Sequence, residues 1–307
     1  MTATPAAHAT AAPPRPRLQR IEAVVNPAAG SVGAGAGDLV RGLLANHGFR
    51  INVRCPEPGK IEAALRAAFD AGPDLVIVLA GDGTARRAAE LAGPNGPLVA
   101  PLPGGTMNLL PRALYGDRPW MDALAHILEH GVARPVSGGR VGGRVFFVGA
   151  VLGPAALLGR AREAIRLRDL GEALRRARHA LRSTFAGELH YRLDGGPERR
   201  TEALALITPM ISRAMDEEAA LEAASFDVHD AGEVVRLAIG GLFGAWRSDP
   251  SVAVAPCRAG VARSRRHTPA ILDGEVFRLP RRTSFGFEPL LFKALAPPDP
   301  LDKTGGI

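Results

Sequence analysis

The sequence predicts an α/β protein: an N-terminal doubly wound parallel α/β domain followed by a β-sandwich-like domain. In the first half, strand-like apolar runs alternate with helical stretches, which is typical of βαβ units. In the second half, short apolar or alternating runs lie between turn residues, as in β-sandwiches. The length of 307 residues suits two domains. The predicted divisions are a disordered tail at 1–20, an α/β domain at 21–134, a β-rich domain at 135–298 and a tail at 299–307.

Within the first half, the clearest strand is the run Leu75–Ala80, which is continuously apolar and rich in β-branched residues. This pattern suits a parallel strand covered on both faces by helices. Asp38 is a good helix N-cap, and Gly48 and Gly72 are suitable helix ends. The expected strands are 21–26, 49–54, 75–80 and 97–101, and the expected helices are 38–46, 61–71 and 84–92.

After about Arg134 the pattern changes to short runs separated by glycine, proline and charged residues. The turn Asp194-Gly195-Gly196 closes one of these runs. The expected strands are 144–151, 188–193, 203–208, 252–255, 260–263 and 275–279. Two helical stretches, at about 160–184 and 232–246, interrupt them.

Composition excludes several classes of protein. The two cysteines, Cys55 and Cys257, are far apart and form no disulfide framework or zinc motif, which indicates a reducing compartment. Residues 1–20 lack the apolar centre of a signal peptide, and no apolar run approaches the roughly 20 residues of a spanning helix. We therefore expect a cytoplasmic protein, and peripheral contact with the inner face of the membrane is compatible with this.

The net charge of +7 permits nucleic acid, an anionic membrane or a phosphorylated substrate as partner. Residues 160–182 combine many arginines with leucines spaced three and four apart, which predicts a basic amphipathic helix. Such a helix can lie on an anionic bilayer or pack against the β domain. Nucleic acid is not expected, because no aromatic residues accompany the arginines. A homodimer is left open.

Three glycine-containing turns each follow a predicted strand. They are Asn26-Pro27-Ala28-Ala29-Gly30-Ser31, Gly81-Asp82-Gly83-Thr84 and Pro103-Gly104-Gly105-Thr106-Met107-Asn108. Ligands of open α/β sheets bind beyond the carboxyl ends of the strands. Glycines let the backbone approach phosphate oxygens, and a following helix directs free N–H groups at them. A single Gly-Asp-Gly is more often an ordinary tight turn. Three on one sheet edge predict a nucleotide-phosphate pocket.

These three motifs, together with Leu272-Asp273-Gly274-Glu275, resemble in order and spacing those of the diacylglycerol kinase catalytic family. That family includes bacterial lipid kinases, sphingosine kinases and ceramide kinase, and it is distantly related to NAD kinases. The resemblance runs from about residue 21 to 295. It implies an active site in the cleft between the two domains, with ATP and Mg²⁺ as cofactors. The implied reaction transfers the γ-phosphoryl group of ATP to the hydroxyl of diacylglycerol or a related membrane lipid.

The resemblance also implies which residues form the site. The catalytic residues are Asp82, Asp273 and Glu275: Asp82 helps to place Mg²⁺–ATP, and the other two activate the lipid hydroxyl. The implied nucleotide-binding residues are Asn26, Gly30, Gly81, Gly83, Thr84, Gly104, Gly105, Thr106 and Asn108.

Phosphoryl transfer also requires that the charge of the transferred group be neutralised. The sequence has neither a GxxxxGK[ST] loop nor the lysine motif of protein kinases. Backbone N–H groups, a metal ion and arginines must therefore neutralise this charge. Arg86 and Arg87 are the nearest arginines, although both also suit a solvated helix surface.

The chain departs from the family pattern at Ala80 and Leu109, where relatives often have Gly and Asp, and at Gly153-Pro154 and 208–215 on the acceptor side. Two alternatives stay open, and the acceptor-side departures favour the first. One is a non-catalytic homologue that binds nucleotide or lipid. The other is an NAD kinase, which is less favoured because no Asn-Glu pair follows the glycine turns.

Overall fold

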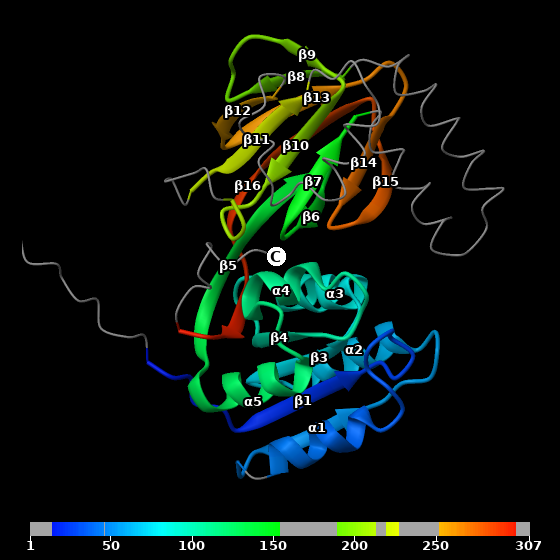
Figure 1. Ribbon diagram of the computed structural model, residues 1–307, viewed down its shortest axis with the longest axis vertical. Coiled ribbons are helices and arrows are strands. Elements are labelled where there is room, and N and C mark those ends of the chain that lie inside the picture. Colours follow the sequence, from blue (N-terminus) through cyan, green and yellow to red (C-terminus); the bar gives the residue numbers. More distant parts are fainter. Residues whose placement is uncertain (1–13, 46, 154–188, 213–218, 227–251, 299–307) are drawn as a thin grey trace, which may run out of the picture.

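The computed structural model describes residues 14–45, 47–153, 189–212, 219–226 and 252–298 (Figure 1). The first part contains a parallel sheet with strand order β2-β1-β3-β4. Its strands are β1 (Arg20–Val25), β2 (Arg50–Arg54), β3 (Leu75–Ala80) and β4 (Leu98–Pro103). Its helices are α1 (Ala36–Ala45), α2 (Ile61–Asp70), α3 (Asp82–Ala92), α4 (Leu109–Tyr115) and α5 (Trp120–His130).

The strand order places a switch point at β1. The chain passes from β1 through α1 to β2 on one side, and then crosses back through α2 to β3 on the other side. Right-handed crossovers therefore put α1 on one face of the sheet and α2 and α3 on the opposite face, as Figure 1 shows. The carboxyl ends of β1, β3 and β4 meet at one edge, where an open α/β sheet holds its ligand.

Burial follows the apolar pattern of the sequence. All six residues of β3 are buried, and α3 packs its alanine face against β3 and β4. Because alanine is small, α3 lies close to the sheet, and its first turn is positioned at the strand ends.

The second part is a sandwich of two sheets. One has the order β12-β11-β10-β7-β14-β15, and the other continues the large sheet through β16-β13-β8-β9. The bounds are β6 (Arg144–Phe146), β7 (Gly149–Leu152), β8 (Leu189–Leu193), β9 (Arg199–Thr201), β10 (Ala203–Ile207), β11 (Leu221–Phe226), β12 (Val252–Cys257), β13 (Ala259–Arg263), β14 (Thr268–Leu272) and β15 (Glu275–Leu279). Buried residues from both sheets form one apolar cluster between them. The predicted fold class is confirmed.

Two long strands join the parts and were not expected from the sequence. β5 (Val132–Val141) and β16 (Arg282–Ala296) run side by side from the α/β part into the β-rich part (Figure 1). β16 pairs in parallel with β4 and antiparallel with β13. Gly286 and Pro289 interrupt the strand pattern of β16 in the sequence, because glycine and proline are typical of turns. The register of β16 on β5 shifts between Glu288 and Phe292, and this irregularity accommodates the proline.

Other expectations need adjustment. The single strand expected at 144–151 is two strands, β6 and β7, and the predicted boundary at residue 134 falls inside β5. The helices expected at 160–184 and 232–246, and residues 1–13 of the N-terminal tail, lie outside the described residues. Within the described ranges, no helix has the length and apolarity needed to cross a bilayer.

Candidate active site

The three glycine turns lie against one another at the carboxyl edge of the parallel sheet. The Ser31 N–H donates to the Gly104 carbonyl at 3.2 Å, and the Asn26 N–H donates to the Leu79 carbonyl at the end of β3 at 2.9 Å. A Cβ at Gly30 would lie 3.6 Å from the Thr106 hydroxyl oxygen. The predicted nucleotide-binding residues are therefore brought together, as the order of the strands requires.

The turns after β3 and β4 approach so closely that side chains are excluded. A Cβ at Gly105 would lie 2.8 Å from the Gly81 Cα, and one at Gly104 would lie 2.8 Å from the Ala80 nitrogen. Real Cβ atoms do not approach backbone this closely, so both positions require glycine. The result is a surface of bare backbone at the sheet edge, of the kind that phosphate groups bind.

Two asparagines predicted to bind nucleotide use their side chains on their own turns. The Oδ1 atom of Asn26 accepts the N–H of Ala28 at 3.1 Å. Asn108 has a positive φ of 51°, and its side chain bonds both the N–H and the carbonyl of Gly105, at 2.7 and 3.0 Å. Both residues hold the turns in shape through their side chains. Thr84 lies in the first turn of α3, whereas Thr106 lies three residues before α4.

The Asp82 carboxylate sits at the N-terminus of α4. Its oxygens accept the N–H groups of Asn108 at 2.8 Å and Leu109 at 2.6 Å. Burial raises the pKa of Asp82, and the N–H donors of Leu109 and Asn108 oppose that rise. Asp82 thus joins the second glycine turn to the third and caps α4, which no feature of the sequence indicated.

Asp273 stands in the tight turn between β14 and β15, with a φ of 46°. Its carboxylate accepts N–H bonds from Phe147 at 2.8 Å, Val148 at 2.9 Å and Gly149 at 3.1 Å. Burial raises the pKa of Asp273 to about 6, against the lowering by these three donors and by the charge of Arg86. At neutral pH this carboxylate is therefore ionised and can accept a proton.

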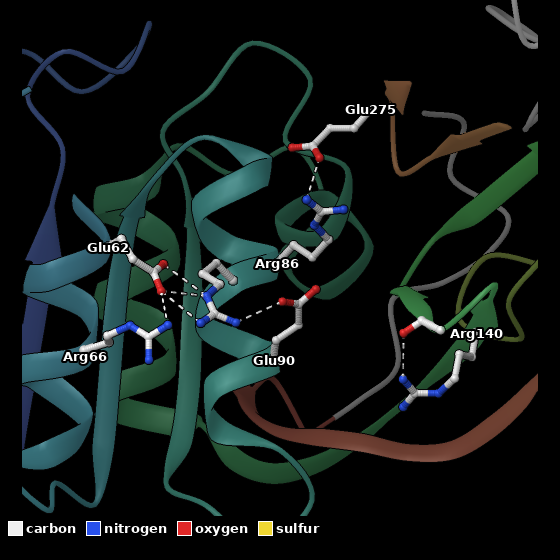
Figure 2. Close-up of polar contacts among 8 residues, drawn as sticks. Glu62, Arg66, Arg86, Glu90, Arg140 and Glu275 are labelled. Atoms are coloured by element: carbon white, nitrogen blue, oxygen red, sulfur yellow. Dashed lines mark hydrogen bonds and ion pairs between the residues drawn. The ribbon is translucent and has the colours of Figure 1, made fainter. Parts of the chain in front are cut away.

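Glu275 connects the β-rich part to the first turn of α3. Its Oε2 atom pairs with Arg86 at 2.5 Å, and Figure 2 shows the two side chains pointing toward each other. A Cβ at Gly83 would lie 2.7 Å from Glu275 Oε1, so this carboxylate rests directly on the second glycine turn. The neighbouring Gly274 faces Met107 of the third turn. The Asp273-Gly274-Glu275 motif therefore meets the glycine turns across the two parts of the molecule.

The two arginines after Thr84 have different surroundings. Arg87 bonds Glu62 of α2 through its Nε and Nη2 atoms, at 2.9–3.0 Å, and also pairs with Glu90. Figure 2 shows Glu62 to the left of α3 and the Arg86–Glu275 pair to its upper right, with Glu90 below Arg86. The Glu62 hydrogen bond raises the pKa of Arg87. Arg86 is the arginine of this pair that faces the site.

Two further residues of the site were missed by sequence reasoning. The guanidinium of Arg144, at the start of β6, lies 4.6 Å from the ring centroid of Phe277, and that of Arg86 lies 5.5 Å from the same ring. These are cation–π distances. Nothing in the sequence pattern distinguishes Phe277 from an ordinary strand residue. Its contacts with Arg86 and Arg144 form only in the folded chain.

No group of three or more His, Cys, Asp or Glu side chains able to hold a metal ion occurs among the described residues. Mg²⁺ usually binds one or two carboxylates together with substrate phosphates and waters. Asp82 offers one such carboxylate, between the second and third glycine turns. The residues present therefore fit a metal that the nucleotide carries. The assignment of Asp82 as a metal ligand stays a prediction.

Comparison with known proteins agrees with this geometry. Residues 20–141 match the sequence model of the diacylglycerol kinase catalytic domain. A diacylglycerol kinase from Bacillus anthracis strain Sterne superposes with a TM-score of 0.66 at 16% identity, covering 94% of this chain and 100% of the other. An NAD kinase from Archaeoglobus fulgidus, solved in complex with ATP, superposes with a TM-score of 0.50 at 10% identity, covering 92% and 95%. No curated protein sequence matches the chain.

The fold and the contact of the glycine turns with the Asp-Gly-Glu turn thus define a two-part α/β and β-sandwich architecture, which this chain shares with those solved structures. The resemblance to the diacylglycerol kinase catalytic family is confirmed over residues 20–141, where the family model matches.

Proposed function

We propose that this protein is an ATP-dependent lipid kinase that phosphorylates the hydroxyl of diacylglycerol or a related membrane lipid. The observation that carries the proposal is the contact of the Asp273-Gly274-Glu275 turn with the glycine turns of the family domain, through Arg86 and Gly83. In this contact the Glu275 carboxylate lies against the phosphate-type backbone surface at Gly83, and Asp273 precedes it by two residues in the same turn. The names of the B. anthracis and A. fulgidus structures support a kinase and ATP, respectively.

In this proposal the glycine turns bind the phosphates of ATP through their backbone, and Asp82 holds the second and third turns in register. Asp273, ionised above about pH 6, acts with Glu275 to accept the proton of the lipid hydroxyl. Mg²⁺, when bound beside Asp82, would neutralise charge on the phosphates. Removing Mg²⁺ with a chelator should therefore abolish phosphotransfer.

A lipid substrate requires contact with a membrane. We infer that the basic stretch at 160–182, which lies outside the described residues, provides this contact on an anionic surface. Co-sedimentation with vesicles with and without anionic lipid, over a salt series, tests the inference. We expect binding that requires anionic lipid and weakens as salt is raised. Binding that is insensitive to salt, or no binding, would contradict it.

The function itself is tested by incubating the purified protein with γ-labelled ATP and a panel of lipids presented in vesicles. Transfer of label to a lipid supports the proposal. Formation of NADP from NAD would instead identify an NAD kinase. Binding of nucleotide without turnover on any acceptor would identify a non-catalytic homologue.

Asp82→Asn and Asp273→Asn should each lower phosphotransfer by about 10²-fold or more, because each removes a charge from the proposed site. Asp194→Asn is a matched control for Asp273. Asp194 also has a φ of 46°, precedes a glycine, and accepts backbone N–H bonds, from Arg258 and Ala259. It lies in the turn between β8 and β9. Full activity in the two site variants, still folded, would refute the assignment.

A further inference from the structure

An internal anion already sits on the phosphate-type surface of this site. The Glu275 carboxylate lies against Gly83 at the first turn of α3 and is paired with Arg86. A bare glycine, a helix N-terminus and a guanidinium are the elements with which proteins bind a phosphate group. Glu275 therefore occupies a position that suits a terminal phosphate.

The Arg86 guanidinium is held independently of this carboxylate. Glu275 and Phe277 are two residues apart on β15, so both side chains lie on the same face of the strand. Arg86 lies over the Phe277 ring at 5.5 Å, and its side chain is 19% exposed. If Glu275 moves away, Phe277 still supports the guanidinium in place.

The Arg86–Glu275 pair is open to competition. The Glu275 side chain is 42% exposed, and water screens an ion pair of this kind. A terminal phosphate carries more negative charge than a carboxylate and offers oxygens for two parallel bonds to a guanidinium. Arg86 thus has two alternative partners, one from the chain and one from the nucleotide.

We propose that Arg86 binds the terminal phosphate of the nucleotide and that Glu275 is its internal competitor, released when ATP binds. This inference rests on the proposed function and deepens it. Arg86 gives the site its discrimination between ATP and ADP, and nucleotide binding frees the Glu275 carboxylate to face the acceptor. In the absence of nucleotide, Glu275 remains on Arg86 and closes the first turn of α3.

The test measures the dissociation constants of Mg²⁺–ATP and Mg²⁺–ADP by calorimetry, without lipid. Arg86→Gln should weaken ATP binding by on the order of tenfold and ADP binding by less than about twofold, since only ATP has the terminal phosphate. Arg86→Lys, which keeps the charge, should recover part of the loss. Arg87→Gln is the matched control, because Arg87 is held by Glu62 and Glu90, and its ATP-to-ADP ratio should equal that of the wild type.

Glu275→Gln gives the more decisive result, because its expected effect on ATP affinity is opposite in sign to that of Arg86→Gln. Removing the competing charge should tighten ATP binding by about three- to tenfold while phosphotransfer falls. In the Arg86→Gln background, the same change should leave ATP affinity unaltered. A merely structural pair would instead give weaker ATP binding for both single variants.

The outcomes separate the inference from the proposed function. Equal loss of ATP and ADP affinity in Arg86→Gln, or weaker ATP binding in Glu275→Gln, overturns the exchange of partners and leaves the kinase proposal intact. Absence of ATP binding by the wild-type protein overturns both. Circular dichroism of each variant at the assay temperature establishes that the protein measured is folded.

Discussion

At the scale of single residues, Asp82 and Asp273 share one arrangement: each holds backbone N–H groups of a neighbouring segment. Asp82 fixes the start of α4, and Asp273 fixes the segment between β6 and β7. Both have raised pKa values because they are withdrawn from water. Their positions therefore serve structure and the proposed chemistry together, and stability and activity must be measured side by side in any variant.

For Asp82, we expect Asp82→Ala to lower the free energy of unfolding by about 0.5–2 kcal/mol, because α4 loses its cap. Urea unfolding measures this cost. Hydrogen exchange should accelerate at the amides of Asn108 and Leu109, the two groups that Asp82 accepts. Unchanged protection of these two amides would show that the carboxylate does not cap the helix.

For Asp273, the folded-state pKa of about 6 lies above the ordinary value of 3.8, so the folded protein binds more protons between these values. The contribution of Asp273 to stability is therefore complete below about pH 4 and is lost as the pH rises through 6. The unfolding free energy of the wild type minus that of Asp273→Asn should fall by on the order of 1–3 kcal/mol between pH 4 and 7. A flat or rising difference would mean that the pKa is not raised.

At the scale of elements, the glycine turns depend on the packing of one turn against another. Gly105→Ala would force its Cβ against the backbone of Gly81. We expect a loss of about 1–3 kcal/mol in stability, together with weaker nucleotide binding, as the two turns separate. Thermal unfolding and calorimetry measure the two effects.

Gly42→Ala provides the contrast. Gly42 lies exposed inside α1, and no atom of the described residues lies within 4 Å of a Cβ built there. The substitution should stabilise the protein by up to about 1 kcal/mol because alanine favours the helix. Similar effects at Gly42 and Gly105 would contradict the close approach of the turns.

At the scale of the whole molecule, β16 belongs to both parts. It pairs with β4 of the parallel sheet, with β13 of the sandwich and with β5, and the Tyr115 hydroxyl donates to the Leu295 carbonyl at 3.1 Å. A substitution that destabilises β16 should therefore destabilise both the α/β part and the β-rich part.

Phe292→Ala tests this. Phe292 is fully buried in β16 and packs edge-on against Phe147 of the β-rich part, with ring centroids 5.3 Å apart. We expect a loss of about 3–5 kcal/mol, with faster hydrogen exchange in both β3 and β10. The exposed Leu39→Ala should change stability by less than about 0.5 kcal/mol. Faster exchange confined to one part would show that the parts unfold separately.

Much of this architecture could be predicted from local pattern. The strand Leu75–Ala80 is buried along its whole length as its apolar run requires, and Ile61–Asp70 forms the expected helix. The three glycine turns follow their strands, and parallel strands bring them to one edge. β16 could not be predicted, because its glycine and proline are tolerated only where β5 accommodates a shift in register.

The fold class, the three glycine turns and the Asp-Gly-Glu turn could be predicted from the sequence, because periodicity and turn preferences depend on neighbouring residues. The contacts between these parts could not be predicted in this way and are known only from the folded chain. The tertiary structure placed Glu275 on Gly83, directed Arg86 toward the site and Arg87 toward α2, and set Asp82 on the N-terminus of α4. These contacts join segments up to about 190 positions apart, as in the Arg86–Glu275 pair, and their geometry depends on the long-range packing of both sheets.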